Sequence, residues 1–305
     1  MSFNELLTTF ANNILPILLV GLAGYILGKT LIVDSRTIGR VVFYIFSPLL
    51  VFNLLITSEL NLKQAITTVG FTAGVIAIMG MLAFTFGKLL QLERPHLLAV
   101  VLTVMFGNTG NYGLPLVKFA FGDEALAVAS LFYVTTTILF NTVGVVIASL
   151  GHTDLKSAVL GLFKLPSLYG VILALLVKSF GIQLAVPLSR TIEIAASGSI
   201  PLMLILLGLE LTHIEWSHSL RAVSTGVLIK LIFGPIVGLL LASVFGLQGH
   251  VRQGSVTQAA MPAAVATTVV ATEYHLEPSL VTAIVFIGTL LSPLTLTPLL
   301  VYLTR

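Results

Sequence analysis

Long apolar segments separated by short polar ones constrain this chain more than any other feature. Hydrophobic residues make up 57% of the sequence and charged residues 9%, and the mean hydropathy is +1.08. The hydrocarbon core of a membrane offers the backbone no hydrogen-bond partners, so an apolar segment of about 20 residues crosses it as a helix. The sequence therefore predicts an all-α integral membrane protein.

Ten apolar segments are long enough to span a bilayer. They cover residues 9 to 28, 38 to 57, 65 to 87, 96 to 119, 124 to 149, 159 to 179, 188 to 209, 219 to 246, 250 to 272 and 279 to 303. No stretch between them is long or polar enough to form a separate soluble domain. We expect ten transmembrane helices in one membrane domain.

Proline positions indicate that the second half of the chain repeats the first. Three pairs occur in order, at separations of 150, 153 and 147 residues: Pro16 and Pro166, Pro48 and Pro201, and Pro115 and Pro262. Five spans in each half would make the second half enter the membrane from the opposite side. We predict two inverted five-helix repeats, residues 1–150 and 151–305. The alternative is coincidence, because membrane helices are rich in proline anyway.

The fourth and ninth spans are interrupted by polar residues, glycine and proline. The interruptions are Gly107 to Pro115 (GNTGNYGLP) and Gln258 to Thr268 (QAAMPAAVATT). Backbone groups freed inside a bilayer need partners in protein or in a water-lined cavity. Paired interruptions predict two broken, crossing helices with a binding site near mid-membrane. The alternative is a pair of structural kinks satisfied by neighbouring helices.

The interruptions supply neutral hydrogen-bonding groups, and restarting helices would add their N-terminal amides. Such amides carry a partial positive charge and favour an anion such as a carboxylate. Two polar residues of the second span extend the candidate set. The candidate substrate-binding residues are Asn108, Thr109, Asn111, Tyr112, Pro115, Gln258, Pro262, Ser47 and Asn53.

Lys230 is the only charged residue deep within a predicted span. An ammonium group there is costly and indicates function. It could attract an anion, offset a carboxylate such as Glu210, or donate to carbonyls freed by Pro235. All 12 Asp and Glu residues fall at or near span ends, which argues against a proton or cation exchanger with a carboxylate at mid-membrane.

Several classes of function lack their sequence signals. The six histidines have no metal-ligand spacing, the chain has no cysteine, and no hydrolase motif or phosphate-binding loop is present. We therefore expect no enzyme activity, no metal and no cofactor. Lys and Arg are scattered singly, so nucleic acid is not an expected partner. Gly24 with Gly28, and Gly70 with Gly74, form G-x-x-x-G steps that support helix packing or a homodimer.

The positive residues of the loops give an orientation. Loops on one side carry eight Lys and Arg residues, and those on the other side, with the termini, carry six. By the positive-inside rule, both termini would be extracytoplasmic in the cell (inner) membrane.

Three motifs carry a family resemblance. The string TQAAMPAAVATTVVATEYHLEPSLVTAIVFIGTLLSPLTL resembles the ninth and tenth spans of the auxin efflux carrier family. Asn108-Thr109 followed by Gly113-Leu114-Pro115-Leu116 is similar to the family's fourth-span motif, and KLIFGP, residues 230–235, to its eighth span. The chain resembles a bacterial-type relative of the plant PIN auxin carriers over its whole length.

The resemblance implies scaffold and transport subdomains with two crossing helices. It assigns Asn108, Pro115 and Pro262 to positions that flank a substrate carboxylate. Two departures from plant members are the short linker, about residues 150–158, and Asn53, near where plant members carry histidine. Small carboxylates such as malonate and malate, associated with bacterial members, are therefore expected rather than auxin.

These observations predict a secondary transporter of small organic anions, working by alternating access. One alternative is a sodium-coupled symporter of the bile-acid-carrier type, in which Gln258, Thr267 and Thr268 would help to hold the cation. Another is a membrane sensor that binds an anion without moving it.

Overall fold

The structure is a computed structural model that describes residues 2–149, 162–212 and 219–305. The regular secondary structure of the described residues is helical, and their only β feature is one isolated bridge. The all-α prediction is confirmed. The predicted boundary between the halves, with the short linker at residues 150–158, lies outside the described residues.

The helices of the first half begin near the N-terminus and end at Ala148. They are α1 (Phe3–Thr9), η1 (Phe10–Ile14), α2 (Leu15–Thr30), α3 (Ser35–Val41), η2 (Val42–Phe46), α4 (Ser47–Thr57), α5 (Leu62–Leu89), α6 (Arg94–Met105), η3 (Thr109–Gly113), α7 (Leu114–Leu139), η4 (Phe140–Gly144) and α8 (Val145–Ala148).

The second half contains the remaining elements. They are η5 (Leu162–Lys164), α10 (Pro166–Ser179), α11 (Val186–Glu210), α12 (Leu220–Leu228), η6 (Ile229–Phe233), α13 (Gly234–Val244), α14 (Gly249–Ala259), α15 (Ala266–Glu273), α16 (Pro278–Leu291) and α17 (Pro293–Leu303). The segment η5 is a 3-10 helix, and the other η segments are π-helical.

Six helical stretches within the described residues are long and apolar enough to cross a membrane, or seven if α16 and α17, bent by 49°, count as one. The six are Phe3–Thr30, Ser35–Thr57, Leu62–Leu89, Thr109–Ala148, Val186–Glu210 and Leu220–Val244. The apolar helices α6 and α10 are shorter. These helices establish a multi-pass membrane protein.

The 40-residue stretch Thr109–Ala148 contains a non-helical residue, Gly122, with φ 77° and ψ −162°. Glycine adopts this conformation without the strain that a side chain would cause. The stretch is therefore two helical parts that meet at Gly122. The predicted fourth span, residues 96–119, corresponds to α6, η3 and the start of α7, and the predicted fifth span follows Gly122.

Four of the π-helical segments lie directly before a proline. After η1, η2, η3 and η6, the next helix has proline as its second residue: Pro16, Pro48, Pro115 and Pro235. Proline cannot donate its backbone hydrogen bond, and its ring collides with the carbonyl four residues earlier. A wider π turn relieves this conflict, so these spans continue through their prolines rather than ending there.

Glycines bring α2 and α11 into backbone contact. A Cβ atom on Gly208 would lie 1.8 Å from the carbonyl oxygen of Gly21, and one on Gly24 would lie 2.3 Å from that of Ile205. Small residues at helix contacts are typical of membrane bundles. In the same way, a Cβ atom on Gly170 of α10 would lie 2.7 Å from the carbonyl oxygen of Pro48 in α4.

Both G-x-x-x-G steps therefore face helices of the same chain. Gly24 and Gly28 contact α11 and the residues after it, and Gly70 and Gly74 face Phe245 and Leu241 at the end of α13. The glycines support packing within the chain and give no support to a homodimer.

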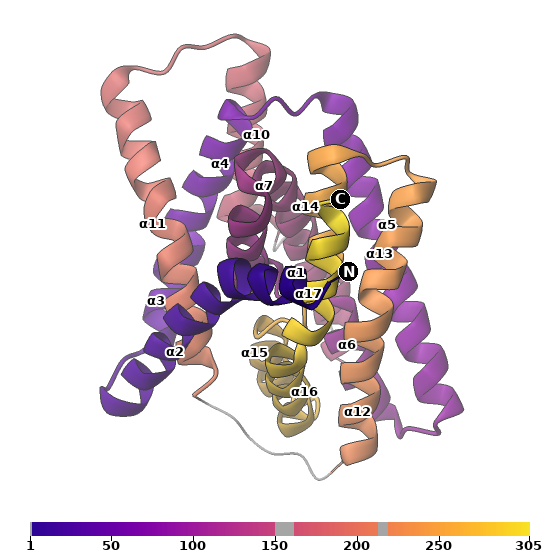
Figure 1. Ribbon diagram of the computed structural model, residues 1–305. Helices are drawn as coiled ribbons and strands as arrows, with labels where there is room; N and C mark the ends of the chain where they lie inside the picture. Colours follow the sequence, from indigo (N-terminus) through magenta and orange to yellow (C-terminus); the bar gives the residue numbers. More distant parts are fainter. Residues whose placement is uncertain (1, 150–161, 213–218) are drawn as a thin grey trace.

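Helices α5 and α13 pack against the helices that flank the two interruptions. Helix α5 packs against α6, α7 and α13, while α14 packs against α7 and α13. Phe71 of α5 contacts Phe132 of α7 and Phe245, with ring centroids 6.2 Å and 6.1 Å apart. Figure 1 shows α15 and α16 below α7 and α14, and α11 at the opposite side of the molecule from α5 and α13.

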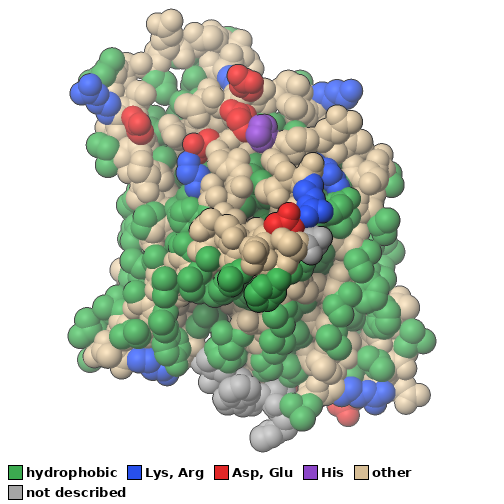
Figure 2. All heavy atoms as spheres, viewed as in Figure 1, with side chains coloured by type: hydrophobic (Ala, Val, Ile, Leu, Met, Phe, Trp, Pro, Cys, Tyr) green, Lys and Arg blue, Asp and Glu red, His purple; other side chains and the backbone are tan. Residues whose placement is uncertain are grey.

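The surface has the polarity of a membrane protein. Figure 2 shows charged side chains over the upper part of this face and at its lower edge, with apolar side chains gathered between them. Large apolar side chains on the outer helices are exposed, including Leu19, Leu173 and Leu240. Lipid tails would cover these side chains.

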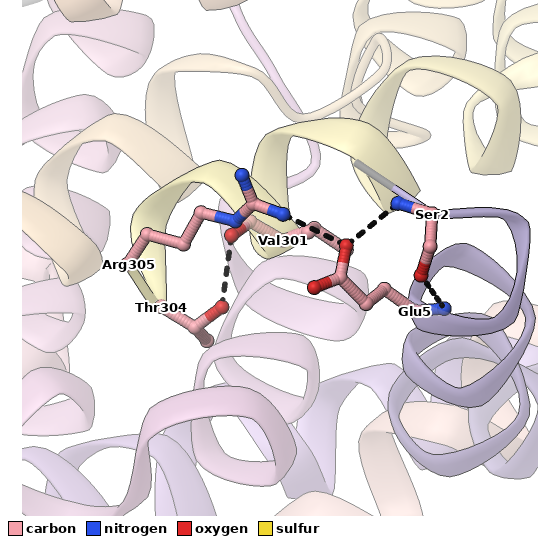
Figure 3. Close-up of polar contacts among 5 residues, drawn as sticks. All are labelled: Ser2, Glu5, Val301, Thr304 and Arg305. Atoms are coloured by element: carbon pink, nitrogen blue, oxygen red, sulfur yellow. Dashed lines mark hydrogen bonds and ion pairs between the residues drawn. The ribbon is translucent and has the colours of Figure 1, made fainter.

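The two ends of the chain lie together (Figure 3). An Arg305 guanidinium nitrogen lies 2.8 Å from Glu5 Oε2, and Glu5 also closes a capping box with Ser2 at the start of α1. Helix α1 packs against α17. The termini therefore lie on the same side of the molecule.

Candidate functional site

The two interruptions meet and pair with each other. Gly107 and Ala263 form an antiparallel bridge. The amide of Asn108 donates to the carbonyl of Pro262 over 2.7 Å, and the amide of Ala264 donates to that of Phe106 over 2.9 Å. Each non-helical segment thus satisfies backbone groups of the other, as the membrane interior requires.

Helices restart after both interruptions, at Thr109 in η3 and at Ala266 in α15. The first amides of a helix have no partner within it. Residues Gly107 to Asn111 and Ala264 to Ala266 line the same cavity. The first residues of η3 and of α15 therefore lie at one cavity.

The two prolines of the interruptions occupy different positions. Around the bridge, Gly107 corresponds to Ala263, a separation of 156 residues, whereas Pro115 and Pro262 are 147 apart. Pro262 lies in the non-helical segment, while Pro115 is the second residue of α7. Only Pro262 takes part in the pairing between the segments.

A cavity of about 310 Å³ lies beside the paired segments. Its walls come from α3, η2, α4, both interruptions, η3, α7, η4, α11 and α15. The polar residues that line it are Ser47, Asn108, Thr109, Asn111, Tyr133, Thr136, Thr137, Asn141 and Glu210. The apolar and glycine residues are Gly39, Val42, Phe43, Phe106, Gly107, Gly110, Phe140, Leu206, Ala264, Val265 and Ala266.

Four of the predicted binding residues line this cavity: Ser47, Asn108, Thr109 and Asn111. Asn108 is 5% exposed, and its Nδ2 has no hydrogen-bond partner among the described residues. An unpaired buried donor is costly. Beside a cavity, such a donor is available to an oxygen atom of a ligand.

Tyr112, Asn53 and Gln258 do not line the cavity. The hydroxyl of Tyr112 accepts a hydrogen bond at 3.2 Å from Oγ of Ser292, the residue between α16 and α17. Gln258 Nε2 donates to the carbonyls of Thr109, at 3.0 Å, and Ala129, at 3.3 Å. Gln258 therefore ties α14 to the first interruption and to α7.

Pro115 and Pro262 are buried and lie outside the cavity wall. Thr267 and Thr268, predicted for a cation site, donate through their hydroxyls to the carbonyls of Ala264, at 2.6 Å, and Val265, at 2.8 Å. These bonds close the first turn of α15. A cation site there stays a prediction.

Lys230 lies next to the first interruption. It is 3% exposed, and its Nζ donates to the carbonyl of Val104, near the end of α6, over 3.0 Å. A positive charge is favourable at the C-terminal end of a helix. Of the three predicted roles, donation to a carbonyl is observed, but that carbonyl belongs to α6 and not to the turn before Pro235. No ion pair within the described ranges includes Lys230.

Sequence reasoning missed the polar face that the fifth span presents to the cavity. Tyr133, Thr136, Thr137 and Asn141 line it, together with Phe140. Their spacing of three or four residues is the signature of one helix face. The run YVTTTILFN contains this signal, although its overall hydropathy hides it.

Glu210 was also missed as a site residue. It is the last residue of α11, as expected for a carboxylate at a span end, but it lines the cavity. Asn111 Nδ2 donates to Glu210 Oε2 over 3.3 Å. A carboxylate at a span end therefore lines the cavity, which the argument from the absence of acidic residues at mid-membrane did not consider.

Comparison with known proteins places these features in context. Residues 9–154 and 151–300 match the family model described as "Membrane transport protein". An uncharacterised transporter of Methanothermobacter thermautotrophicus is 26% identical over 92% of this chain and 93% of its own length. One from Methanocaldococcus jannaschii is 28% identical, with the same coverage. A probable auxin efflux carrier component 3b of Oryza sativa subsp. japonica is 27% identical over 43% of this chain and 22% of its own length.

Proposed function

The chain belongs to the membrane transport protein family, that of the auxin efflux carriers, and from this premise we propose that it is a secondary carrier of small organic anions, with carboxylates as the substrate class. The family match and the archaeal relatives indicate a transporter and not an enzyme.

One observation carries the proposal: the starts of two helices and the unpaired amide of Asn108 meet at a single cavity of about 310 Å³. Helix N-termini favour anions, and an amide N–H donates to a carboxylate oxygen. The volume is at the small end of ligand sites, which suits a ligand of few heavy atoms. The residues proposed to bind the substrate carboxylate are Asn108, Thr109 and Asn111.

The architecture that fits this function is a ten-span bundle of two inverted five-helix repeats. Helix α2 packs against α11, and α4 packs against α10. These contacts join the first span to the seventh and the second to the sixth, so each half contributes its first two spans to one group. The antiparallel pairing of the two interruptions supports the same two-fold relationship.

The position of the cavity supports a mechanism of alternating access. Its walls include α4 and α11, which belong to a first group made of α2, α4, α10 and α11. They also include the two interruptions and α7, which belong to a second group made of the other spans. Movement of the second group against the first would open the cavity to one side of the membrane and then to the other. We place the carrier in the cell (inner) membrane with both termini extracytoplasmic.

Flux into proteoliposomes tests the proposal. Labelled lactate, malate and malonate would be compared with choline, a cation, and glycerol, a neutral solute. We expect saturable uptake of at least one carboxylate and background uptake of choline and glycerol. Equal uptake of all five, or preference for choline, would contradict the proposal.

The same assay separates the alternatives. Stimulation by a sodium gradient would identify a sodium-coupled symporter and would direct attention to Gln258, Thr267 and Thr268. Carboxylate binding without flux, measured as thermal stabilisation of the purified protein, would identify a sensor.

A further inference from the structure

Glu210 brings a carboxylate into the cavity proposed for an anion. Its Oε2 accepts a hydrogen bond from Asn111 Nδ2 at 3.3 Å, and both residues line the cavity with Asn108. Asn111 belongs to η3, so the donor comes from the first interruption. A substrate carboxylate in this cavity would therefore share its space, and one of its candidate donors, with Glu210.

No neighbouring cation pairs with Glu210 in the part of the chain that the structure describes. Helix α11 packs against α2, α3, η2, α4, η3 and α7, and α4 carries no titratable side chain. The titratable or charged residues of the other five elements are Tyr25, Lys29, Arg36, Arg40, Tyr44, Tyr112, Lys118, Asp123, Glu124 and Tyr133. Of these, only Tyr133 lines the cavity.

One positive group at this end of α11 is engaged elsewhere. Lys29 Nζ donates to the carbonyl of Thr212, two residues beyond Glu210, over 3.1 Å. On α11 itself, Arg190 and Glu193 lie near the opposite end of the helix. Glu210 also occupies the last position of α11, where the helix dipole disfavours a negative charge.

Two negative charges in one small, partly apolar cavity repel each other strongly, because little water screens them. When like charges share such a site, one of the two groups takes up a proton. A protonated Glu210 no longer needs the amide of Asn111, and its own O–H can donate. Protonation thus converts the side chain from a competitor of the anion into a further donor.

We propose that Glu210 takes up one proton when a carboxylate anion enters the cavity and releases it when the anion leaves. The inference rests on the proposed function, because it requires an anion in this cavity. The proton comes from a hydronium ion in solution: one O–H bond of that ion breaks and leaves water, one O–H bond forms on the Glu210 carboxylate, and no other covalent bond changes. Binding of the anion and binding of the proton then favour each other.

Affinity measured against pH tests the proposal. The affinities of lactate, malate and malonate would be determined by thermal stabilisation at several pH values between about 5.5 and about 8.5, on both sides of neutral pH. The proteins would be the parent, Glu210→Gln and Glu193→Gln, in which Glu193 is exposed on the same helix. The ionisation of each ligand is common to all three proteins, so the ratio of parent to Glu210→Gln affinity reports on Glu210 alone.

The ratio of parent to Glu210→Gln affinity should fall about tenfold for each unit of rise in pH over the range in which Glu210 of the free protein is ionised, because binding then requires the uptake of one proton. Glu193→Gln should follow the parent. A pH-sensitive dye in weakly buffered parent protein should also detect proton uptake as the ligand binds, which keeps the test valid if Glu210→Gln does not fold.

The outcomes distinguish the inference from the proposed function. A ratio independent of pH, or no proton uptake by the parent on ligand binding, would overturn the role of Glu210 and leave the carrier proposal standing. No stabilisation of the parent by any of the three carboxylates at any pH would contradict the proposed function, and the inference with it.

Discussion

The backbone amide of Asn108 donates to the carbonyl oxygen of Pro262 over 2.7 Å, joining two interruptions that lie 154 residues apart in the sequence (262 − 108). This bond uses the backbone N–H of Asn108, whereas the side-chain Nδ2 has no hydrogen-bond partner and lies beside the cavity. One residue thus holds the two segments together and offers a ligand donor.

Replacing Asn108 by alanine removes the side-chain donor and keeps the backbone bond to Pro262. We expect carboxylate affinity and flux to fall about tenfold or more, since a hydrogen bond to a charged group contributes about 1.5–3 kcal/mol. The melting temperature should change little, because the amide has no protein partner to lose. Ligand-induced thermal stabilisation and proteoliposome flux measure the effect.

Val285→Ala is the matched control, because Val285 is 2% exposed and does not line the cavity. It should lower the melting temperature and leave affinity unchanged. If Asn108→Ala binds and transports like the parent, the unpaired amide is not a ligand donor.

Gly208→Ala should destabilise the protein even though alanine is the better helix former. Its Cβ would lie 1.8 Å from the carbonyl oxygen of Gly21, so α2 and α11 would have to separate. Overpacking of this kind costs about 1–3 kcal/mol. The melting temperature in detergent should fall by several degrees. Gly21→Ala, whose Cβ would lie 3.9 Å from the nearest atom, should melt like the parent; equal melting of both variants would count against this close contact.

Lys230→Met should weaken carboxylate binding. The ammonium lies 3.3 Å from the Cβ position of Gly107, a residue of the cavity wall, so its charge acts on an anion across one residue. Two unit charges about 8 Å apart interact by about 2 kcal/mol at an effective dielectric constant of about 20. The exposed Lys63→Met is the control. Unchanged affinity at a lowered melting temperature would restrict Lys230 to supporting the carbonyl of Val104.

Both termini should react from the extracytoplasmic side. The chain has no cysteine, so Ser2→Cys and Thr304→Cys each introduce a single thiol. The Glu5–Arg305 ion pair holds these positions together, and a fully exposed Ile32 lies between α2 and α3. An impermeant reagent should label the two terminal cysteines in intact cells and Ile32→Cys only after permeabilisation. The reverse pattern would invert the orientation.

The membrane class and the two interruptions could be predicted from sequence, because both follow from local composition. Lipid demands apolar segments of a certain length, and Gly110, Gly113 and Pro262 mark where a regular helix is unfavourable. The family resemblance depended on the same local strings, and the family match confirmed it.

The composition of the cavity could not be predicted in the same way. Glu210 reaches the cavity because α11 ends beside η3, and that neighbourhood depends on packing between distant parts of the chain. Tyr133 and Thr136 lie on a span whose average hydropathy conceals one polar face. Conversely, Tyr112 and Gln258 looked like ligand donors but bond to Ser292, Thr109 and Ala129 instead.

Protection of a single cysteine in the cavity tests the central claim most directly. Thr137 lines the cavity and is partly exposed, so a small thiol reagent should reach Thr137→Cys. We predict that a carboxylate transported by the parent slows this reaction in a saturable manner, while choline does not, and that Ile32→Cys reacts at the same rate throughout. Equal reaction of Thr137→Cys with and without a saturating transported carboxylate would show that the anion binds elsewhere and would contradict the account.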